Sequence, residues 1–424
     1  MTGRGASGSL AAVARERQPL PAGFATIWTA VALDLVGFGI VLPFLPRYAE
    51  RFGATPVTVG LLVASFSLMQ LVFSPLWGRV SDRYGRKPVL VLSLVGTAVG
   101  SLVTGLAGSL WLLFAGRIID GISGASVSVA QAAVTDVAEP EQRARLLGYL
   151  GAAFGLGFVA GPAIGALAVL AGPELPFLLA AAIAAVNAVV AIRRLPETNP
   201  PAQRSLLADP SRAAAPGRRL ASVDVLRLAA VGFLALVAFS AFEATFALLG
   251  ERRFDLSESS TYVVFVGVGL VLVLVQGALV HPVVKRLGEL GALRAGLALD
   301  AAGLLLLAVA RPRAVLVVAL VLLVVGQGLV APTLASLVAA RARHDRRGSA
   351  LGVQQSAGGL ARVVGPTAGG LLFQHVGLSA PSLAGAALAA GAALLTVPPR
   401  PHQPPAVGDD DDVGASRTSN VPSV

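Results

Sequence analysis

Ionisable side chains interrupt long apolar stretches of this sequence at six places. They are three aspartates, one glutamate and two arginines: Asp34, Arg117, Asp120, Glu243, Asp300 and Arg362. An ionised side chain in a hydrocarbon environment costs roughly 3 kcal/mol, so residues of this kind are either paired or functional. A carboxylate that is hydrated or paired in one state of a protein and neither in another takes up and releases a proton. These residue types therefore point to proton transfer coupled to a conformational change.

Asp34 is the first candidate for the proton carrier, because it lies about eleven residues into its apolar stretch and so near its middle. Glu243 is the second candidate. Asp120 ranks third, since Arg117 lies one helical turn away and is placed to neutralise it. Arg117 is also the candidate partner for Asp34, although the sequence does not show whether the two meet.

The remaining polar residues predict no catalytic centre. The chain has no cysteine, and its four histidines are dispersed, mostly at loops or tails: His281, His344, His375 and His402. No nucleophile with a base, no metal-ligand cluster and no G-x4-G-K-[ST] phosphate loop is present. We expect no enzyme activity, no metal and no cofactor. Asp300 is expected to have a structural role, because its helix is peripheral. Glutamines such as Gln70 either orient a polar substrate or, more commonly, bond between helices.

A short loop carries four cations around one carboxylate, in the segment Gly78-Arg-Val-Ser-Asp82-Arg83-Tyr-Gly85-Arg86-Lys-Pro. Glycines at both ends permit a sharp, closely packed turn. Two interpretations remain open at this point. The loop is either a specific motif or a merely basic segment beside a membrane.

Small residues at one-turn spacing follow further along the chain, at Gly148, Gly157, Gly161 and Gly165, with Pro162 among them. Glycines at this spacing allow two helix backbones to approach closely, and a proline in mid-helix bends the helix by deleting a hydrogen bond. The alternative to a specialised motif is generic close packing.

The elements that must position these residues are membrane-spanning helices. Hydrophobic residues make up 55% of the 424 and charged residues 13%, which a soluble globular protein does not show. Stretches of about 20 apolar residues, each long enough for a ~30 Å hydrocarbon layer, recur along the chain. We predict twelve spans, at about 24–46, 55–77, 89–107, 111–133, 146–170, 175–192, 225–250, 262–283, 291–310, 314–339, 349–373 and 378–397.

The net charge of +10 reflects topology. Six of the 33 lysines and arginines lie between spans on one side, and nearly all the others lie on the side that carries both termini. This asymmetry places both termini in the cytoplasm. A nucleic-acid partner is not expected, because the cations are scattered over separate segments and form no single basic patch.

The chain contains an internal repeat. A shift of 204 residues places seven residues on identical ones, pairing Arg143, Gly148, Gly155, Gly161, Pro162, Gly165 and Gly124 with Arg347, Gly352, Gly359, Gly365, Pro366, Gly369 and Gly328. We predict two pseudo-symmetric six-helix bundles, over 24–192 and 225–397. They are preceded by a cytoplasmic segment 1–23, joined by an arginine- and proline-rich linker 193–224, and followed by a disordered cytoplasmic tail 398–424.

The loop at Gly78 resembles the major facilitator superfamily signature G-x-x-x-D-R-x-G-R-[KR] in full, and the glycine motif at Gly148 resembles that of the antiporter branches, with Ala166 where the usual last glycine stands. The resemblance covers about residues 24–397 and is greatest to tetracycline and multidrug/proton antiporters. It implies an all-α membrane fold in which the first, fourth, seventh and tenth helices line the cavity. It also implies that Asp82 faces the start of the eleventh helix near Ser349, while Arg86 pairs with Asp136 to latch the cytoplasmic side.

The function that this resemblance implies is secondary active export of an amphipathic, drug-like small molecule in exchange for protons, by alternating access. The alternative is a proton-coupled symporter or a uniporter of a sugar or another small metabolite. The expected partners are the small-molecule substrate, protons and the lipid bilayer of the cell membrane, and the protein is expected to work as a monomer.

Overall fold

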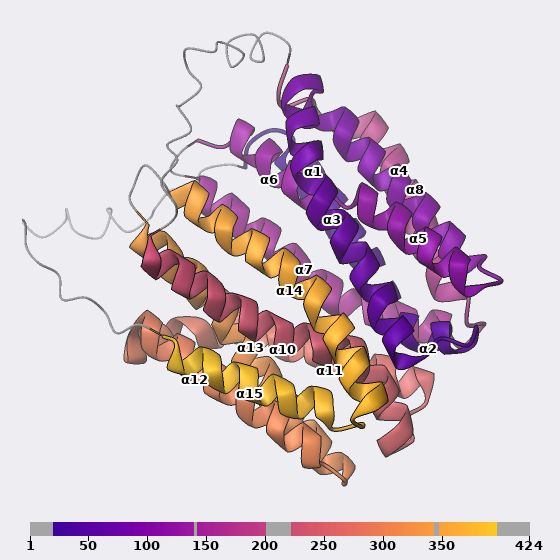
Figure 1. Ribbon diagram of the computed structural model, residues 1–424. Coiled ribbons are helices and arrows are strands. Elements are labelled where there is room, and N and C mark those ends of the chain that lie inside the picture. Colours follow the sequence, from indigo (N-terminus) through magenta and orange to yellow (C-terminus); the bar gives the residue numbers. More distant parts are fainter. Residues whose placement is uncertain (1–19, 140–141, 201–221, 343–346, 397–424) are drawn as a thin grey trace, which may run out of the picture.

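The computed structural model describes residues 20–139, 142–200, 222–342 and 347–396, which are almost entirely helical (Figure 1). The predicted segments 1–23 and 193–224 are described only in part, and the predicted tail lies almost wholly outside the described residues. In chain order the helices are α1 (Phe24–Val41), α2 (Leu45–Glu50), α3 (Pro56–Tyr84), α4 (Arg86–Gly105), α5 (Leu110–Ser123), α6 (Ser126–Val137), α7 (Arg143–Ala168), α8 (Leu175–Arg194), α10 (Val223–Phe254), α11 (Glu258–Leu274), the π-helical turn η2 (Val275–Leu279), α12 (Val280–Val309), α13 (Arg313–Arg341), α14 (Arg347–His375) and α15 (Ala380–Leu394).

Nine helical segments of the described chain are long and apolar enough to cross a membrane, by length and composition. One of them, Glu258–Val309, has 52 residues and thus the length of two crossings. Gly288 interrupts it with φ 71° and ψ 169°, a conformation that favours glycine. The more polar α14 and the 15-residue α15 complete an arrangement consistent with twelve crossings.

The helices form two bundles, α1 to α8 and α10 to α15, an arrangement consistent with six crossings in each (Figure 1). The repeated glycines have the same role in both bundles. In the first, Gly161 of α7 lies against the backbone of Gly39 in α1. In the second, its counterpart Gly365 of α14 lies against Val237 and Ser240 in α10. Glycine is required because a Cβ atom at either position would meet backbone or Cβ atoms at 2.6–2.8 Å.

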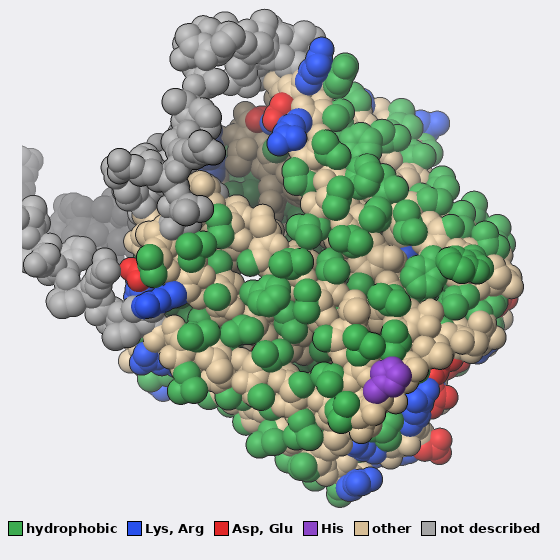
Figure 2. Space-filling model, viewed as in Figure 1, with side chains coloured by type: hydrophobic (Ala, Val, Ile, Leu, Met, Phe, Trp, Pro, Cys, Tyr) green, Lys and Arg blue, Asp and Glu red, His purple; other side chains and the backbone are tan. Residues whose placement is uncertain are grey.

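The two bundles meet along two helix pairs, α3 with α14 and α7 with α11. Gly60 of α3 packs on the backbone of Pro366, and Gly269 of α11 packs on the backbone of Phe158. We call the end of the molecule that carries α2 the α2 end, and the opposite end, which carries the turn at Gly85 between α3 and α4, the Arg86 end. Large apolar side chains are exposed over the outer surface, as lipid-facing positions require (Figure 2).

The fourth predicted span, 111–133, is two helices and not one. α5 ends at Ser123 and α6 begins at Ser126, because Gly124 has a non-helical ψ of 44°. The break lies within the apolar part of the bundle, where carbonyl groups released from a helix have no water to bind. Their partners must therefore come from other side chains.

Three side chains of α3 and α4 supply those partners. The bonds run from Gln70 Nε2 to the Gly124 oxygen at 2.9 Å, from Trp77 Nε1 to the Ile122 oxygen at 2.6 Å, and from the Ser93 hydroxyl to the Ser123 oxygen. Of the two roles open to Gln70, the structure shows a bond between helices. The sequence showed neither the break nor its partners, because both depend on how α3 and α4 pack against α5.

Replacement of Trp77 by phenylalanine tests this account of the break. Trp77→Phe keeps an aromatic ring but leaves the Ile122 carbonyl without its donor, at a cost of about 1–3 kcal/mol. We expect a lower apparent melting temperature of the purified protein in detergent. Trp111→Phe is the matched control, because the Trp111 side chain is 82% exposed. Equal effects of the two substitutions would contradict the account.

Candidate transport pathway

A space between the two bundles is lined by a stripe of partly exposed residues on α10. Between Ala235 and Gly250, the residues that are not fully buried are Leu236, Phe239 and Glu243. Their spacing of three and four places them on one face of the helix. From Ala244 to Gly250, toward the α2 end, every residue is buried, so the space ends at the level of Glu243.

Helix α1 contributes a similar face. Between Ala30 and Val41, the residues that are not fully buried are Leu33, Asp34 and Phe38. Phe38 also contacts Phe66 of α3, with ring centroids 5.6 Å apart. The first helix of each bundle therefore brings one carboxylate to this region. Figure 2 shows the molecular surface hollowed between the two halves on the side away from the α2 end.

The side chain of Asp34, in α1, lies beside the amino end of α6, the second helix of the broken span. The Ser126 hydroxyl, at the first residue of α6, donates to Asp34 Oδ2 at 2.5 Å. The amino end of a helix attracts a negative charge. The other carboxylate oxygen, Oδ1, is buried and has no hydrogen-bond partner among the described residues. Arg117, the partner that the sequence suggested for Asp34, forms its ion pair elsewhere.

Arg117 pairs with Asp120. The guanidinium Nη1 lies 2.9 Å from Asp120 Oδ2, and the two side chains are 4% and 10% exposed. The Arg117 guanidinium also lies over the ring of Phe66, 4.3 Å from its centroid. A buried ion pair of this kind neutralises both groups within α5. Asp120 is thus held by the cation one turn away, as its spacing in the sequence indicates.

Glu243 of α10 and Arg362 of α14 form no ion pair in the described structure. The charge of Arg362 acts on Glu243, and no hydrogen bond or ion pair links the two side chains in the described structure. Asp300 of α12 is different, because it is fully buried beside Gly326 of α13, away from both residues. Neither of its carboxylate oxygens has a partner among the described residues.

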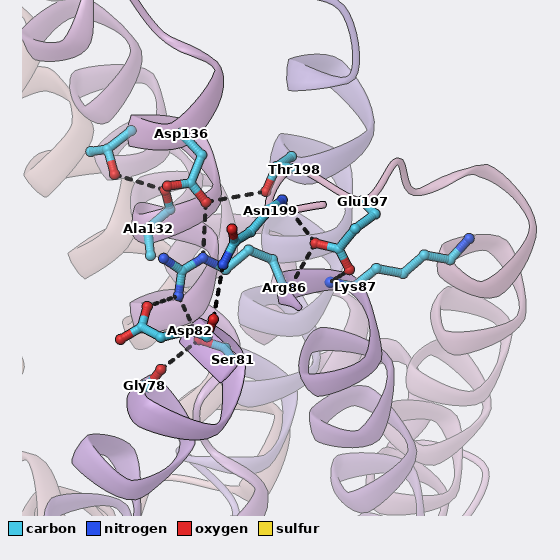
Figure 3. A network of polar contacts seen from close by, with 11 residues as sticks. Gly78, Ser81, Asp82, Arg86, Lys87, Ala132, Asp136, Glu197, Thr198 and Asn199 are labelled. Atoms are coloured by element: carbon cyan, nitrogen blue, oxygen red, sulfur yellow. Dashed lines mark hydrogen bonds and ion pairs between the residues drawn. The ribbon is translucent and has the colours of Figure 1, made fainter. Parts of the chain in front are cut away.

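At the Arg86 end, Arg86 joins α3, α4 and α6 (Figure 3). Its guanidinium binds Asp136 at 2.9 Å, Asp82 at 2.6 Å and the Ser81 hydroxyl at 2.7 Å. Burial lowers the pKa of Arg86, but bonds to Asp136 and Asp82 outweigh it and raise the pKa above its usual value. The expected neighbours Arg86 and Asp136 are therefore in contact.

The other residues of the loop have more local roles. Gly85 has φ 110°, which favours glycine, and lets α4 begin directly after α3. Arg83 stacks on the ring of Tyr84, and the Gly78 carbonyl accepts a hydrogen bond from the Ser81 hydroxyl at 2.8 Å. Asp82 is 66% exposed and binds Arg86 within its own bundle. Among the described residues no hydrogen bond or ion pair joins Asp82 to Ser349, and the surface between the two halves is hollowed on this side (Figure 2).

Glu197 caps the amino end of α4 beside this loop, a role that the sequence analysis did not identify. Its carboxylate accepts hydrogen bonds from the backbone N–H groups of Arg86 at 2.9 Å and Lys87 at 3.3 Å, the first residues of α4. Asn199 donates to the Asp82 carbonyl at 3.1 Å. A carboxylate is favoured at the amino end of a helix. The signal in the sequence was the Leu195-Pro-Glu-Thr segment, whose contact with α4 is visible only in the fold (Figure 3).

The glycine motif of α7 has two different contacts. Gly157 and Gly161 pack on α1 within the first bundle, whereas Gly165 packs on the ring of Tyr262 in α11 of the second. The Tyr262 hydroxyl donates to the Ile40 carbonyl at 3.2 Å, which also joins the bundles. Pro162 lies inside α7, and nothing lies within 4 Å of a Cβ placed at Gly148. Gly157 and Gly161 thus allow α7 to pack closely on α1, whereas Gly165 allows α7 to pack on α11 of the other bundle.

Three ion pairs join the bundles at the α2 end. They link Arg47 with Glu251 at 3.0 Å, Arg51 with Glu258 at 2.8 Å, and Glu50 with Arg252 at 2.6 Å. Each pair has one member in or next to α2 and the other in α10 or at the start of α11. These ion pairs therefore hold the two bundles together at the α2 end. The hollow in the molecular surface lies toward the Arg86 end.

The sequence profile of the Major Facilitator Superfamily matches residues 27–366 and 282–421 of this chain. Over 374 residues the chain is 32% identical to the class C tetracycline resistance protein of Escherichia coli, which covers 87% of this chain and 93% of that protein. It is 29% identical over 350 residues to multidrug resistance protein 1 of Bacillus subtilis, covering 81% of this chain and 88% of that protein.

A solved structure has the same arrangement of helices. The crystal structure of the human organic anion transporter MFSD10 matches with a TM-score of 0.68 and 29% sequence identity. The match covers 88% of this chain and 98% of that one.

The α2 end gives a prediction about pH. Burial raises the pKa of Glu50 above its usual value, although Arg252 acts to lower it. Neighbouring Glu251 raises this pKa further and Arg47 lowers it. Because the closed form then binds a proton more tightly than a form with Glu50 in water, closure is strengthened at acidic pH and weakened as pH rises through the raised pKa. Glu50→Gln removes this dependence.

The measurement is a distance between spin labels at Ala171→Cys and Arg311→Cys, one in each half at this end, in a chain that has no other cysteine. These pairs are partly exposed, so the open-to-closed ratio is expected to change by no more than about fivefold. A distance that lengthens on acidification would contradict the prediction.

Proposed function

Because this chain belongs to the major facilitator superfamily, we propose that it exports an amphipathic small molecule across the cell membrane in exchange for protons, by alternating access. The family consists of membrane transporters. The similarity to a tetracycline resistance protein and to a multidrug resistance protein, over more than four fifths of the chain, supports export of a drug-like compound.

The observation that carries proton coupling is the position of Asp34. It lies on the partly exposed face of α1, is bound on one oxygen by Ser126 and has no cationic partner. A carboxylate in this position changes its protonation when the bundles move and its hydration changes. Arg117 is held by Asp120, which leaves Asp34 and Glu243 as the carboxylates on the faces of the space.

The arrangement of contacts supports alternating access. The halves are tied together by ion pairs at the α2 end and separated at the Arg86 end, where the Arg86 cluster lies within the first bundle. We propose that the Arg86 end is cytoplasmic, so that this conformation faces inward. In the outward-facing form, Asp82 would then contact the start of α14, and the loop would act as the latch.

The alternative is a symporter or a uniporter that imports a small metabolite. Both functions use the same fold, so the direction of coupling distinguishes them. An antiporter moves substrate against the proton flow, whereas a symporter moves both in one direction. We propose that both termini lie in the cytoplasm. A single copy of the chain is expected to be sufficient for transport.

A flux measurement tests the proposed function directly. In inside-out vesicles that contain the protein, we expect tetracycline to accumulate when the lumen is made acidic. Accumulation should stop on addition of a protonophore, because the proton gradient is the energy source. Flux that continues under the protonophore and requires ATP would overturn the proposal, and accumulation driven by an alkaline lumen would support symport.

A second measurement tests Asp34. Asp34→Asn keeps an acceptor for Ser126 but is permanently neutral, so its substrate affinity is expected to be independent of pH. Downhill exchange continues while uphill export fails. Asp300→Asn is the control, because Asp300 is buried away from the space and this variant should keep the pH dependence. If tetracycline affinity in well-folded Asp34→Asn still varies with pH as in the wild type, the assignment moves to Glu243.

A further inference from the structure

Arg362 is an exposed cation halfway along a helix that is long enough to cross the membrane. It is the sixteenth of the 29 residues of α14. An arginine at this depth is costly unless it faces water or a partner. Its guanidinium has no hydrogen bond or ion pair in the described part of the chain. The side on which it is exposed therefore decides its role.

The neighbours on α14 fix that side. The exposed apolar residues Leu360, Val364 and Leu371 are 47%, 37% and 44% exposed and mark the lipid side. They lie two or nine positions from Arg362, and at 3.6 residues per turn both separations place them on the opposite side of the helix. Gln355, seven positions away and also exposed, lies on the same side as Arg362.

The packing of α14 confirms this direction. Gly358 and Gly365, on either side of Arg362 in the sequence, face α10, while Gly359 and Pro366 face α3. Arg362 thus projects between α10 and α3, into the space between the two bundles.

The surroundings of Arg362 combine one weak counter-charge with apolar surface. The nearby carboxylate, Glu243, acts on it by charge but is not bonded to it. On the same face of α10 as Glu243 lie Leu236 and Phe239. A planar guanidinium that is unpaired beside apolar and aromatic side chains suits a carboxylate, sulfonate or enolate on an apolar body. A site of a few charged groups on an apolar wall is typical of small-molecule pockets.

We propose that Arg362 binds an anionic group of the transported molecule, and that Glu243 is its counter-ion while the space is empty. This inference rests on the proposed transport function and narrows the substrate class to amphipathic organic anions. The anionic group of the substrate replaces Glu243 as the partner of Arg362. Substrate binding thereby releases Glu243, and the two residues select for negative charge at a site separate from Asp34.

Binding of two matched probes tests the inference. Anilinonaphthalenesulfonate carries a sulfonate, and phenylnaphthylamine has the same aromatic body without it. Equilibrium dialysis of both against the full-length protein in phosphatidylcholine nanodiscs, with empty nanodiscs subtracted, gives the preference for the anion. We expect the wild type to prefer the sulfonate, and Arg362→Gln to lose about tenfold in affinity for it while its affinity for the neutral probe is unchanged.

Other variants separate this role from a loss of folding. Arg362→Lys keeps a charge and should lose less affinity for the sulfonate than Arg362→Gln. Glu243→Gln removes the competing carboxylate and should strengthen sulfonate binding. Leu360→Ala, on the lipid side of the same helix, should change neither probe. The proposal is overturned if the wild type shows no preference for the sulfonate, or if the preference persists in Arg362→Gln. Because dialysis uses no gradient, this result is independent of whether export is driven by protons.

Discussion

The absence of water from the bilayer is the constraint on which the rest of this structure depends. Every polar group at membrane depth must find a partner inside the protein. The break between α5 and α6 persists because Gln70, Trp77 and Ser93 bind the carbonyls that it frees. Arg117 is held by Asp120 for the same reason. A buried polar atom without a hydrogen-bond partner among the described residues, such as Oδ1 of Asp34, is therefore a candidate for a functional role.

Close packing of glycines complements this constraint. Hydrophobic burial does not favour helix association in lipid, so contact depends on backbones that approach closely. Gly161 and Gly365 provide such contacts inside the two bundles, whereas Gly165 and Gly60 provide them between bundles. The contacts inside a bundle join helices into a unit, and those between bundles lie mainly along two helix pairs, with ion pairs at the α2 end besides. Two firm units joined in this way fit the alternating access that we propose.

Charge is distributed according to this division. The ion pairs between bundles are at the α2 end, in or beside α2 and at the ends of α10 and α11, where water is available and pairs are weak and reversible. The Arg86 cluster lies at the other end and belongs to one bundle. Asp34, Glu243 and Arg362 remain between the two, on faces that are partly or fully exposed. These three residues form no ion pair among the described residues, and they lie where a substrate or a proton is able to reach them.

The sequence alone determined the fold to a large extent, because apolar length, cation asymmetry and a repeat of 204 residues are local or periodic signals. It also identified the Arg117–Asp120 pair, whose members are one turn apart, and the family resemblance identified the partners Arg86 and Asp136. It did not show the break at Gly124, the cap that Glu197 places on α4, or that Arg117 is not the partner of Asp34. Those depend on which helices meet and on which face each residue lies. Contacts between residues far apart in the sequence, such as Glu197 with Arg86, 111 positions away, arise only when the helices pack, and so the tertiary structure alone decided them.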